Sequence, residues 1–372
     1  MKKLTVLHSA VVMENSESLH DYFAWPTVAR LADGRLAVAA SGFRTDHLCP
    51  FGKSVLSFSE NGGESFTPPA PVIDTVLDDR DAGIAIMGKN AVFTSFNNTL
   101  AYQRERADRV PGTRAAYFHA YLDHAGKDPE KEKAAFGSSF KLSHDGGVTW
   151  SKTRYPSPVT APHGAFFTED GRLLYIGCKF GSSTEVECHE IDPETGKMTY
   201  LGTIPPIENG AFPSYEPHGI ALKDGSLLAI IRTERQPVDK NWQNAYEIFT
   251  MYRSVSRDGG KTWSVPVLLA TKGDAPDPLK LGAPPHLTRD SKGRILLTAA
   301  KRIKPLGIYV YVSLDEGETF EAYELPTTLP DTADFGYPAT VERADGSYFT
   351  VWYQHLTNTS PAIITGAAWQ FE

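Results

Sequence analysis

The sequence is poor in cysteine, in long apolar runs and in basic charge. Its 372 residues include three cysteines (Cys49, Cys178 and Cys188) and no Cys-x-x-Cys pair, which excludes a disulfide framework and gives no sign of a zinc site. No apolar run approaches the ~20 residues that a membrane-spanning helix needs. Because 37 Lys and Arg residues stand against 45 Asp and Glu residues, the net charge of −8 argues against a protein that binds nucleic acid or a membrane surface.

The composition and length are those of a soluble globular protein. Apolar residues make up 41% and charged residues 22%, which excludes a disordered chain. The length favours one large repeat-built domain or two ordinary ones. The stretch from Met1 to Leu7 could open a signal peptide, but His8 interrupts the apolar run and no cleavage site follows clearly. We therefore expect a β-strand from Leu4 to Val12 and a cytoplasmic protein.

A short motif, Ser-x-Asp-x-Gly-x-Thr-Trp, occurs four times along the chain. The copies lie at residues 143–150, 256–263 and 313–320, with a looser copy at 59–66 in which Asn61 replaces the aspartate. Asp or Asn can hydrogen-bond nearby backbone amides, and Gly supplies the positive φ of a tight turn. The Thr and the aromatic residue then begin the next strand. Each copy therefore predicts a turn between two strands.

A second repeat interleaves with the first and predicts a strand, a tight turn and a strand. Each copy has a Pro or Gly, an apolar stretch, Asp-Gly or Lys-Gly, and a second apolar stretch. Copies begin near residues 26, 83, 162, 217, 285 and 338, and the copy at 83 is degenerate. The intervals of 53 to 79 residues are about the size of a four-stranded blade with its loops.

These repeats predict one all-β domain over residues 1–372, a six-bladed β-propeller. Segments with helical periodicity are nearly absent, which disfavours an α/β fold. Residues 362–371 can pair with the N-terminal strand and close the ring. The widest interval holds a charged insertion at about 101–135. We expect a solvated loop there that could include a short helix, with a lid or an oligomer contact as the alternative.

The turn motifs resemble the Asp-boxes, also called BNR repeats, of the sialidase (neuraminidase) superfamily. The resemblance covers nearly the whole chain and implies the sialidase-like propeller. It does not by itself imply the chemistry, because Asp-boxes lie on the far side of the propeller from the active site and also occur in non-enzymes. The function has to be argued from other residues.

In a propeller the ligand site lies on the axis, where the innermost strand of each blade begins. The predicted strand starts gather polar and aromatic side chains there, namely Trp25, Arg80, Asp81, His163, Tyr215, Glu216, His218, His286 and Tyr337. Such a set is unusual in a purely structural core, because buried carboxylates and imidazoles are costly unless they are paired. We therefore expect a ligand pocket at this end of the axis.

The resemblance implies roles for three residues. In sialidases a Glu begins one axial strand and an Arg ends the return strand, which matches Glu216 and Arg232, 16 residues apart. Glu216 would be the base, Arg232 part of a carboxylate clamp, and Tyr337, at the start of the last blade, the nucleophile. A phenol with its usual pKa of ~10 needs a neighbouring carboxylate to accept its proton. A neutral phenol also avoids the repulsion between a carboxylate nucleophile and an anionic sugar.

Two aspartates compete for the role of general acid. The family places its acid in a loop after the second strand, which matches Asp46, whereas Asp81 begins an axial strand. A general acid needs a raised pKa, from burial or a neighbouring carboxylate. The cluster at residues 78–81 could supply such a carboxylate for Asp81, while Arg80 would oppose the shift. Both aspartates stay candidates.

The clamp departs from the family pattern. Sialidases carry Phe-Arg-Ile-Pro at the first strand, and this chain reads Phe-Ala-Trp-Pro, with Ala24 in place of an arginine. Arginine is suited to bidentate carboxylate binding, so its loss weakens the clamp. Arg302 is the candidate for the third clamp arginine. Arg44, Arg80 or Lys53 could substitute for the missing one.

The three Pro-His strand starts are also outside the sialidase pattern. We predict that His163, His218 and His286 bind sugar hydroxyls together with Trp25, although imidazoles could also hold a metal ion. The prediction includes no metal and no cofactor.

Three functions are compatible with these residues. The leading hypothesis is an exo-acting glycoside hydrolase of the sialidase type that removes a terminal sialic acid or related acidic sugar from a glycan. The second is a polysaccharide lyase acting on uronates, because β-elimination needs a His or Tyr base and a cation near the carboxylate. The third is a non-catalytic carbohydrate-binding propeller, against which the clustered Glu216, Arg232, Tyr337 and Asp81 argue.

Overall fold

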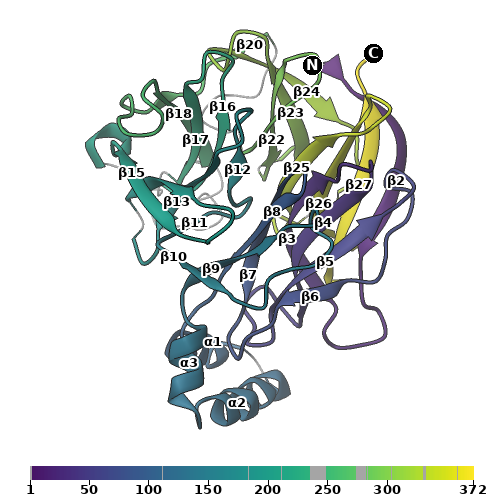
Figure 1. Cartoon of the computed structure of the whole chain (residues 1–372). Coiled ribbons are helices and arrows are strands. Elements are labelled where there is room, and N and C mark those ends of the chain that lie inside the picture. The colour runs from purple at the N-terminus through teal and green to yellow at the C-terminus, as the bar shows by residue number, and fades with distance from the viewer. Residues whose placement is uncertain are drawn as a thin grey trace.

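The computed structural model of the chain is a ring of six β-sheets (Figure 1). It describes residues 2–110, 112–182, 184–210, 212–234, 249–273, 282, 284–302, 304–329, 332–357 and 359–372. The innermost strands of successive sheets contact one another in a closed cycle, which confirms the predicted six-bladed β-propeller.

The first three blades take up the N-terminal half of the chain. Blade 1 consists of β3 Tyr22–Arg30, β4 Leu36–Arg44, β5 Lys53–Ser59 and β6 Ala70–Ile73, from the axis outward. Blade 2 consists of β7 Arg80–Met87, β8 Asn90–Phe96, β9 Ser138–Ser143 and β10 Tyr155–Ser157. Blade 3 has the short strands β11 Val159–Thr160 and β12 Phe166–Phe167, followed by β13 Leu173–Lys179, β14 Val186–Ile191 and β15 Met198–Ile204.

The other three blades follow the 3₁₀ turn η1 Ile207–Gly210. Blade 4 consists of β16 Tyr215–Ala221, β17 Leu227–Glu234, β18 Phe249–Ser256 and β19 Val267–Leu268. Blade 5 consists of β21 His286–Arg289, β22 Ile295–Lys301, β23 Gly307–Ser313 and β24 Phe320–Leu325, with β1 Lys2–Lys3 and β20 Thr271–Lys272 added in parallel to β24. Blade 6 consists of β25 Gly336–Glu342, β26 Tyr348–His355, β27 Ala362–Gln370 and the N-terminal β2 Thr5–Met13.

The two ends of the chain close the ring within blade 6. β2 pairs antiparallel with β27 from Thr5 opposite Gln370 to Met13 opposite Ile364, and the purple and yellow strands lie side by side in Figure 1. The predicted N-terminal strand and the predicted closure are both confirmed. Such closure joins the first and last segments of a long chain and leaves no open edge between the first and last blades.

The Asp-box motifs form the predicted turns between the third and fourth strands of their blades. In the second blade, Asp145 Oδ1 accepts from the backbone N–H groups of Val148 and Thr149 at 3.1 and 2.9 Å, and the Thr149 hydroxyl donates to Oδ2 at 2.5 Å. These donors hold the pKa of Asp145 at about 2. At Gly317 of another box, φ is +81° and a Cβ would lie 2.5 Å from a Leu228 side-chain carbon, so glycine is required there.

The charged insertion is helical, so the expectation of a solvated loop was wrong. It forms α1 Leu100–Ala107, α2 Thr113–Ala125 and α3 Pro129–Ala135. Buried Leu100, Phe118 and Leu122 pack with Cys49 and Leu77 from blade 1 and the loop that leads to β7. Thr99 and Asp128 cap the first and third helices. The insertion, at the lower end of the view in Figure 1, therefore packs on the loops that follow β4 and precede β7. None of the described helices is long and apolar enough to cross a membrane.

Candidate active site

Four innermost strands begin with the same unusual backbone conformation. Trp25, Asp81, Glu216 and Tyr337 have φ of 55°, 51°, 42° and 52°, a region that few residues other than glycine adopt. In each case the pairing with the second strand shifts register at this point, as at a β-bulge. Bulges re-aim side chains, and strained residues of this kind gather at functional sites. The sequence analysis did not foresee this repeated bulge, although each of the four residues precedes Pro or Ala.

The bulges bring Tyr337, Glu216 and Arg232 together. The Tyr337 hydroxyl donates to Glu216 Oε1 at 2.5 Å, although the two residues are 121 positions apart. Arg232 Nη1 donates to the other carboxylate oxygen of Glu216 and lies 3.3 Å from the Tyr337 oxygen. Tyr215, beside Glu216, pairs with Arg232 across the strands. The tyrosine–carboxylate pair that the sequence analysis expected is therefore present in the fold.

The surroundings keep the Tyr337 phenol protonated. Burial raises the pKa of Tyr337 well above its usual value, and the Glu216 carboxylate raises it further while Arg232 opposes the shift. Burial alone would lower the pKa of Arg232, but its interactions with Glu216, Tyr337 and Glu234 raise it. The resting site therefore holds a neutral phenol that donates to Glu216, beside a charged guanidinium.

A second guanidinium, that of Arg302, lies over the Tyr337 ring, with its central carbon 5.3 Å from the ring centre. Its Nε donates to the Phe335 carbonyl at 2.8 Å and its Nη2 to the Tyr353 hydroxyl at 3.3 Å. Arg232 therefore contacts the oxygen of Tyr337, and Arg302 contacts its ring. Two guanidinium groups in this arrangement can bind a carboxylate at the sugar.

The two candidate acids lie in different environments. Asp81 is 8% exposed, and its Oδ1 is buried without a hydrogen-bond partner among the described residues. Burial raises its pKa to about 7, with Arg80 opposing and the Glu216 charge adding to the shift. Asp46 has a side chain 45% exposed that accepts from Arg114 of α2 at 2.7 Å. The environment of Asp81 therefore favours a protonated carboxyl near neutral pH.

Arg44, Arg80 and Trp25 pack against one another. The guanidinium groups of Arg44 and Arg80 lie 4.9 and 4.2 Å from the Trp25 ring centre, in cation–π contact. Arg44 is fully buried and donates to both oxygens of Asp78, which also contacts Arg80 at 3.5 Å. Lys53 forms an ion pair with Asp74. The contacts of Arg44 and Lys53 are therefore with protein carboxylates, whereas Trp25 contacts Tyr337 edge-on at 6.4 Å.

The three Pro-His starts link neighbouring blades. His218 Nδ1 accepts from the backbone N–H of Leu287 in blade 5 at 2.9 Å, and His286 Nδ1 accepts from that of Thr340 in blade 6 at 3.3 Å. His163 Nδ1 lies 3.0 Å from the Thr27 hydroxyl of blade 1, and its ring is 6.4 Å from that of Tyr337. Burial lowers the pKa of all three imidazoles, that of His218 to about 3, so they are neutral. Among the described residues, no group of His, Cys, Asp and Glu side chains has metal-ligand geometry. A role of these histidines as sugar ligands remains a prediction.

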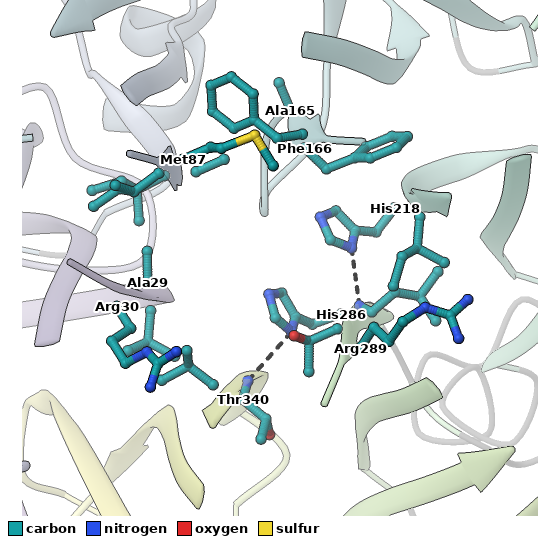
Figure 2. Close-up of a pocket in the computed structure, with 18 of the residues that line it drawn as sticks. Ala29, Arg30, Met87, Ala165, Phe166, His218, His286, Arg289 and Thr340 are labelled. Carbon is teal, nitrogen blue, oxygen red and sulfur yellow. Dashed lines mark hydrogen bonds between the residues drawn. The ribbon is translucent and has the colours of Figure 1, made fainter. Parts of the chain in front are cut away.

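An axial cavity of about 350 Å³ lies at the other end of the innermost strands, and all six of them line it. His218 and His286 point their rings into it from one side, opposite Ala29 and Met87 (Figure 2). The Tyr337–Glu216 pair sits at the starts of β25 and β16, and the cavity at their ends. The histidines therefore separate the candidate active site from this cavity.

A cluster around Asp334 was not foreseen from the sequence. Its carboxylate contacts Tyr22, Tyr353, His47 and His355, which come from blades 1 and 6. Burial opposes ionisation, but hydrogen bonds from His355 and His47 lower the pKa of Asp334. No repeat or spacing indicated this residue, because it lies in the loop before β25.

A family comparison agrees with the propeller fold. The model of the BNR repeat-like domain matches residues 122–351, more than half of the chain. The chain belongs to the BNR repeat-like family. No curated protein matches this BNR repeat-like chain.

Solved structures share the propeller of this BNR repeat-like protein at low identity. A Dyadobacter fermentans protein of unknown function has 17% identity and a TM-score of 0.73, with 100% of both chains covered. The Ruminococcus gnavus intramolecular trans-sialidase, bound to oseltamivir carboxylate, has 13% identity and a TM-score of 0.60 over 98% of both chains. Trypanosoma rangeli sialidase, bound to the inhibitor DANA, has 12% identity and a TM-score of 0.60 over 98% of this chain and 58% of its own. These likenesses confirm a sialidase-like fold.

Proposed function

We propose that the protein is an exo-acting glycoside hydrolase that cleaves a terminal acidic sugar, of the sialic acid type, from a glycan. The observation that carries this proposal is the 2.5 Å hydrogen bond from the Tyr337 hydroxyl to Glu216 beside two guanidinium groups. A hydrogen-bonded carboxylate can take the proton of a buried phenol as the phenol attacks.

The proposed reaction has two steps. Tyr337 Oη forms a bond to the anomeric carbon while its proton passes to Glu216 and the glycosidic C–O bond breaks, its electron pair staying on the departing oxygen. Asp81 gives its proton to that oxygen, for which its pKa of about 7 is suited. Water then attacks the anomeric carbon and gives a proton to Asp81, while the bond from that carbon to Tyr337 Oη breaks and Glu216 returns its proton to this oxygen. Asp81 is favoured over Asp46 because Asp46 faces Arg114.

The charge of the site supports an acidic sugar. Arg232 and Arg302 lie beside Tyr337, the residue whose oxygen the sugar would approach. Guanidinium groups bind carboxylates through paired N–H donors, so they favour a substrate that carries its acid group next to the anomeric centre. The sialidases among the structurally similar proteins are consistent with this class of substrate.

Replacing Tyr337 by phenylalanine tests the proposal. We expect wild-type protein to hydrolyse fluorogenic glycosides of acidic sugars, and the Tyr337→Phe variant to lose at least about 10³-fold in kcat/KM with its melting temperature retained, because only the nucleophilic oxygen is removed. Tyr309→Phe, a buried tyrosine of β23 away from the pair, is the matched control.

The same assay separates the alternatives. Release of a product that absorbs as an unsaturated uronate would favour the lyase and contradict hydrolysis. Glycan binding without turnover over a broad panel of glycosides would favour a non-catalytic propeller. Full activity of the Tyr337→Phe variant would refute the assignment of the nucleophile.

A further inference from the structure

The two guanidinium groups beside Tyr337 do not carry equal free charge. Arg232 contacts the carboxylates of both Glu216 and Glu234, so much of its charge is already balanced. The hydrogen bonds of Arg302 instead go to uncharged oxygens, one of them the Tyr353 hydroxyl at 3.3 Å. An acid group that binds next to Tyr337 therefore lies near two guanidinium groups. The charge of Arg302 is not balanced by a carboxylate in its hydrogen bonds, whereas that of Arg232 is largely balanced.

A hydrogen-bond chain leads from Arg302 to an imidazole at the rim of the site. Tyr353, which contacts Arg302, donates to Asp334 Oδ1 at 2.9 Å, and the same oxygen lies 3.3 Å from His47 Nδ1. Asp334 Oδ2 accepts from Tyr22 at 2.9 Å and lies 2.8 Å from His355 Nε2. The carboxylate is thus saturated with donors and holds the His47 ring in place.

His47 is partly exposed and packs beside Trp25, a residue of the candidate site. Its side chain is 46% exposed, whereas that of Trp25, against which its ring packs edge-on at 5.0 Å, is almost completely buried. Trp25 in turn contacts Tyr337. All the hydrogen bonds of the His47 ring within the described residues are made by Nδ1, so Nε2, on the opposite edge, is available to a ligand.

The charges around His47 set when it is cationic. Burial lowers its pKa, Asp334 raises it, and Arg80 and Arg44 lower it again. The other titratable groups nearby are Asp46, which faces Arg114, the hydroxyl of Tyr22, and His355, whose pKa Asp334 raises against the effect of burial. An entering carboxylate would add negative charge and favour the imidazolium form, so proton uptake should accompany binding.

We propose that His47, oriented by Asp334, binds the acid group of the substrate through Nε2 as an imidazolium. The resemblance to sialidases implies an arginine at the position of Ala24, which is completely buried and carries no charge. The inference rests on the proposed function in one respect, the acidic sugar. It makes recognition of that sugar dependent on pH, with tighter binding below the pKa of His47 than above it.

The experiment measures the affinity of an acidic sugar by calorimetry in a background where Asp81 no longer titrates. The probes are DANA and its methyl ester, and the proteins are Asp81→Asn, Asp81→Asn with His47→Gln, and Asp81→Asn with Asp334→Asn. We expect Asp81→Asn to bind DANA roughly fivefold more tightly at about pH 5.5 than at about pH 8, with proton uptake, and the ester without pH dependence.

The double variants decide the role of His47. His47→Gln should abolish the pH dependence and the proton uptake, and Asp334→Asn should move both to lower pH, because the charge that raises the pKa of His47 is gone. The control His20→Gln, an imidazole bonded to Tyr117 and Phe43 instead, should leave both unchanged. Equal pH dependence with and without His47 would overturn the inference. If no protein binds DANA but a neutral glycoside is hydrolysed through Tyr337, the inference fails and hydrolysis stands.

Discussion

At the scale of single residues, the environment of Asp81 makes it different from the other carboxylates of the site. It is buried, one of its oxygens has no partner among the described residues, and its pKa is about 7. Asp79, two residues earlier, is also buried, and burial raises its pKa to about 6, but hydrogen bonds from Thr75 and Asn97 oppose the shift. A buried carboxyl without such donors prefers to be neutral, which is the state that a proton donor needs.

The Asp81→Asn variant follows from this environment. If Asp81 is the proton donor, the activity of the wild type should fall as the pH rises through about 7. The variant should have little activity at any pH, and its remaining activity should not fall in this range. Stability should respond as well. The pKa of Asp81 is raised on folding, so its contribution to stability is lost as the pH rises towards 7, and the variant should lack this loss. Melting temperature against pH checks it.

The competing aspartate provides the comparison for that variant. Asp46→Asn removes the ion pair with Arg114 and leaves Asp81 in place. A large loss of activity in Asp46→Asn with little change in Asp81→Asn would reverse the assignment of the acid.

At the scale of elements, the Asp-box turns stabilise the ends of blades rather than the site. In each of the three boxes with an aspartate, the carboxylate accepts at least two hydrogen bonds, one from a backbone N–H group and one from a threonine hydroxyl. The boxes lie at the ends of the third strands, on the same side of the propeller as the axial cavity. The Asp-box motifs therefore predict the fold. They do not indicate the chemistry, because they lie away from the candidate active site.

Asp145→Ala should lower the melting temperature by a few degrees and leave activity unchanged, because the turn loses its acceptor far from Tyr337. The pKa of Asp145 is lowered to about 2, so its contribution is present above the unfolded pKa and disappears as the pH falls towards 2. The difference from wild type in thermal unfolding should shrink accordingly. Val148→Ala, an exposed neighbour in the same turn, is the control, and an equal effect of both variants would contradict this role.

At the scale of the whole molecule, the sequence predicted the features that repeat. The six strand starts, the four turns and the closure by residues 362–371 each follow a local pattern, and each is present. Glu216, Arg232 and Tyr337 could be named as candidates because the resemblance to sialidases matches their places in the chain. The propeller then brings them together across 121 positions.

The features that the sequence did not predict depend on tertiary packing. The insertion forms helices because Phe118 and Leu122 bury against Cys49 and Leu77, a partner surface that no local pattern reveals. Asp334 lies in a cluster only because side chains of two blades hydrogen-bond to its carboxylate. The histidines at the strand starts could be seen as a group. That the Nδ1 atoms of His218 and His286 accept backbone hydrogen bonds from the next blade could not be seen.

The most direct test of the central claim is whether the sugar becomes bonded to Tyr337 during turnover. The protein would be incubated with a fluorinated, slowly released analogue of an acidic sugar, and then digested and examined by mass spectrometry. We predict a mass increase of one sugar unit on the peptide that contains Tyr337, and none in Tyr337→Phe. A labelled Glu216 or Asp81, or rapid hydrolysis of unmodified acidic glycosides with no covalent adduct on any residue, would contradict it.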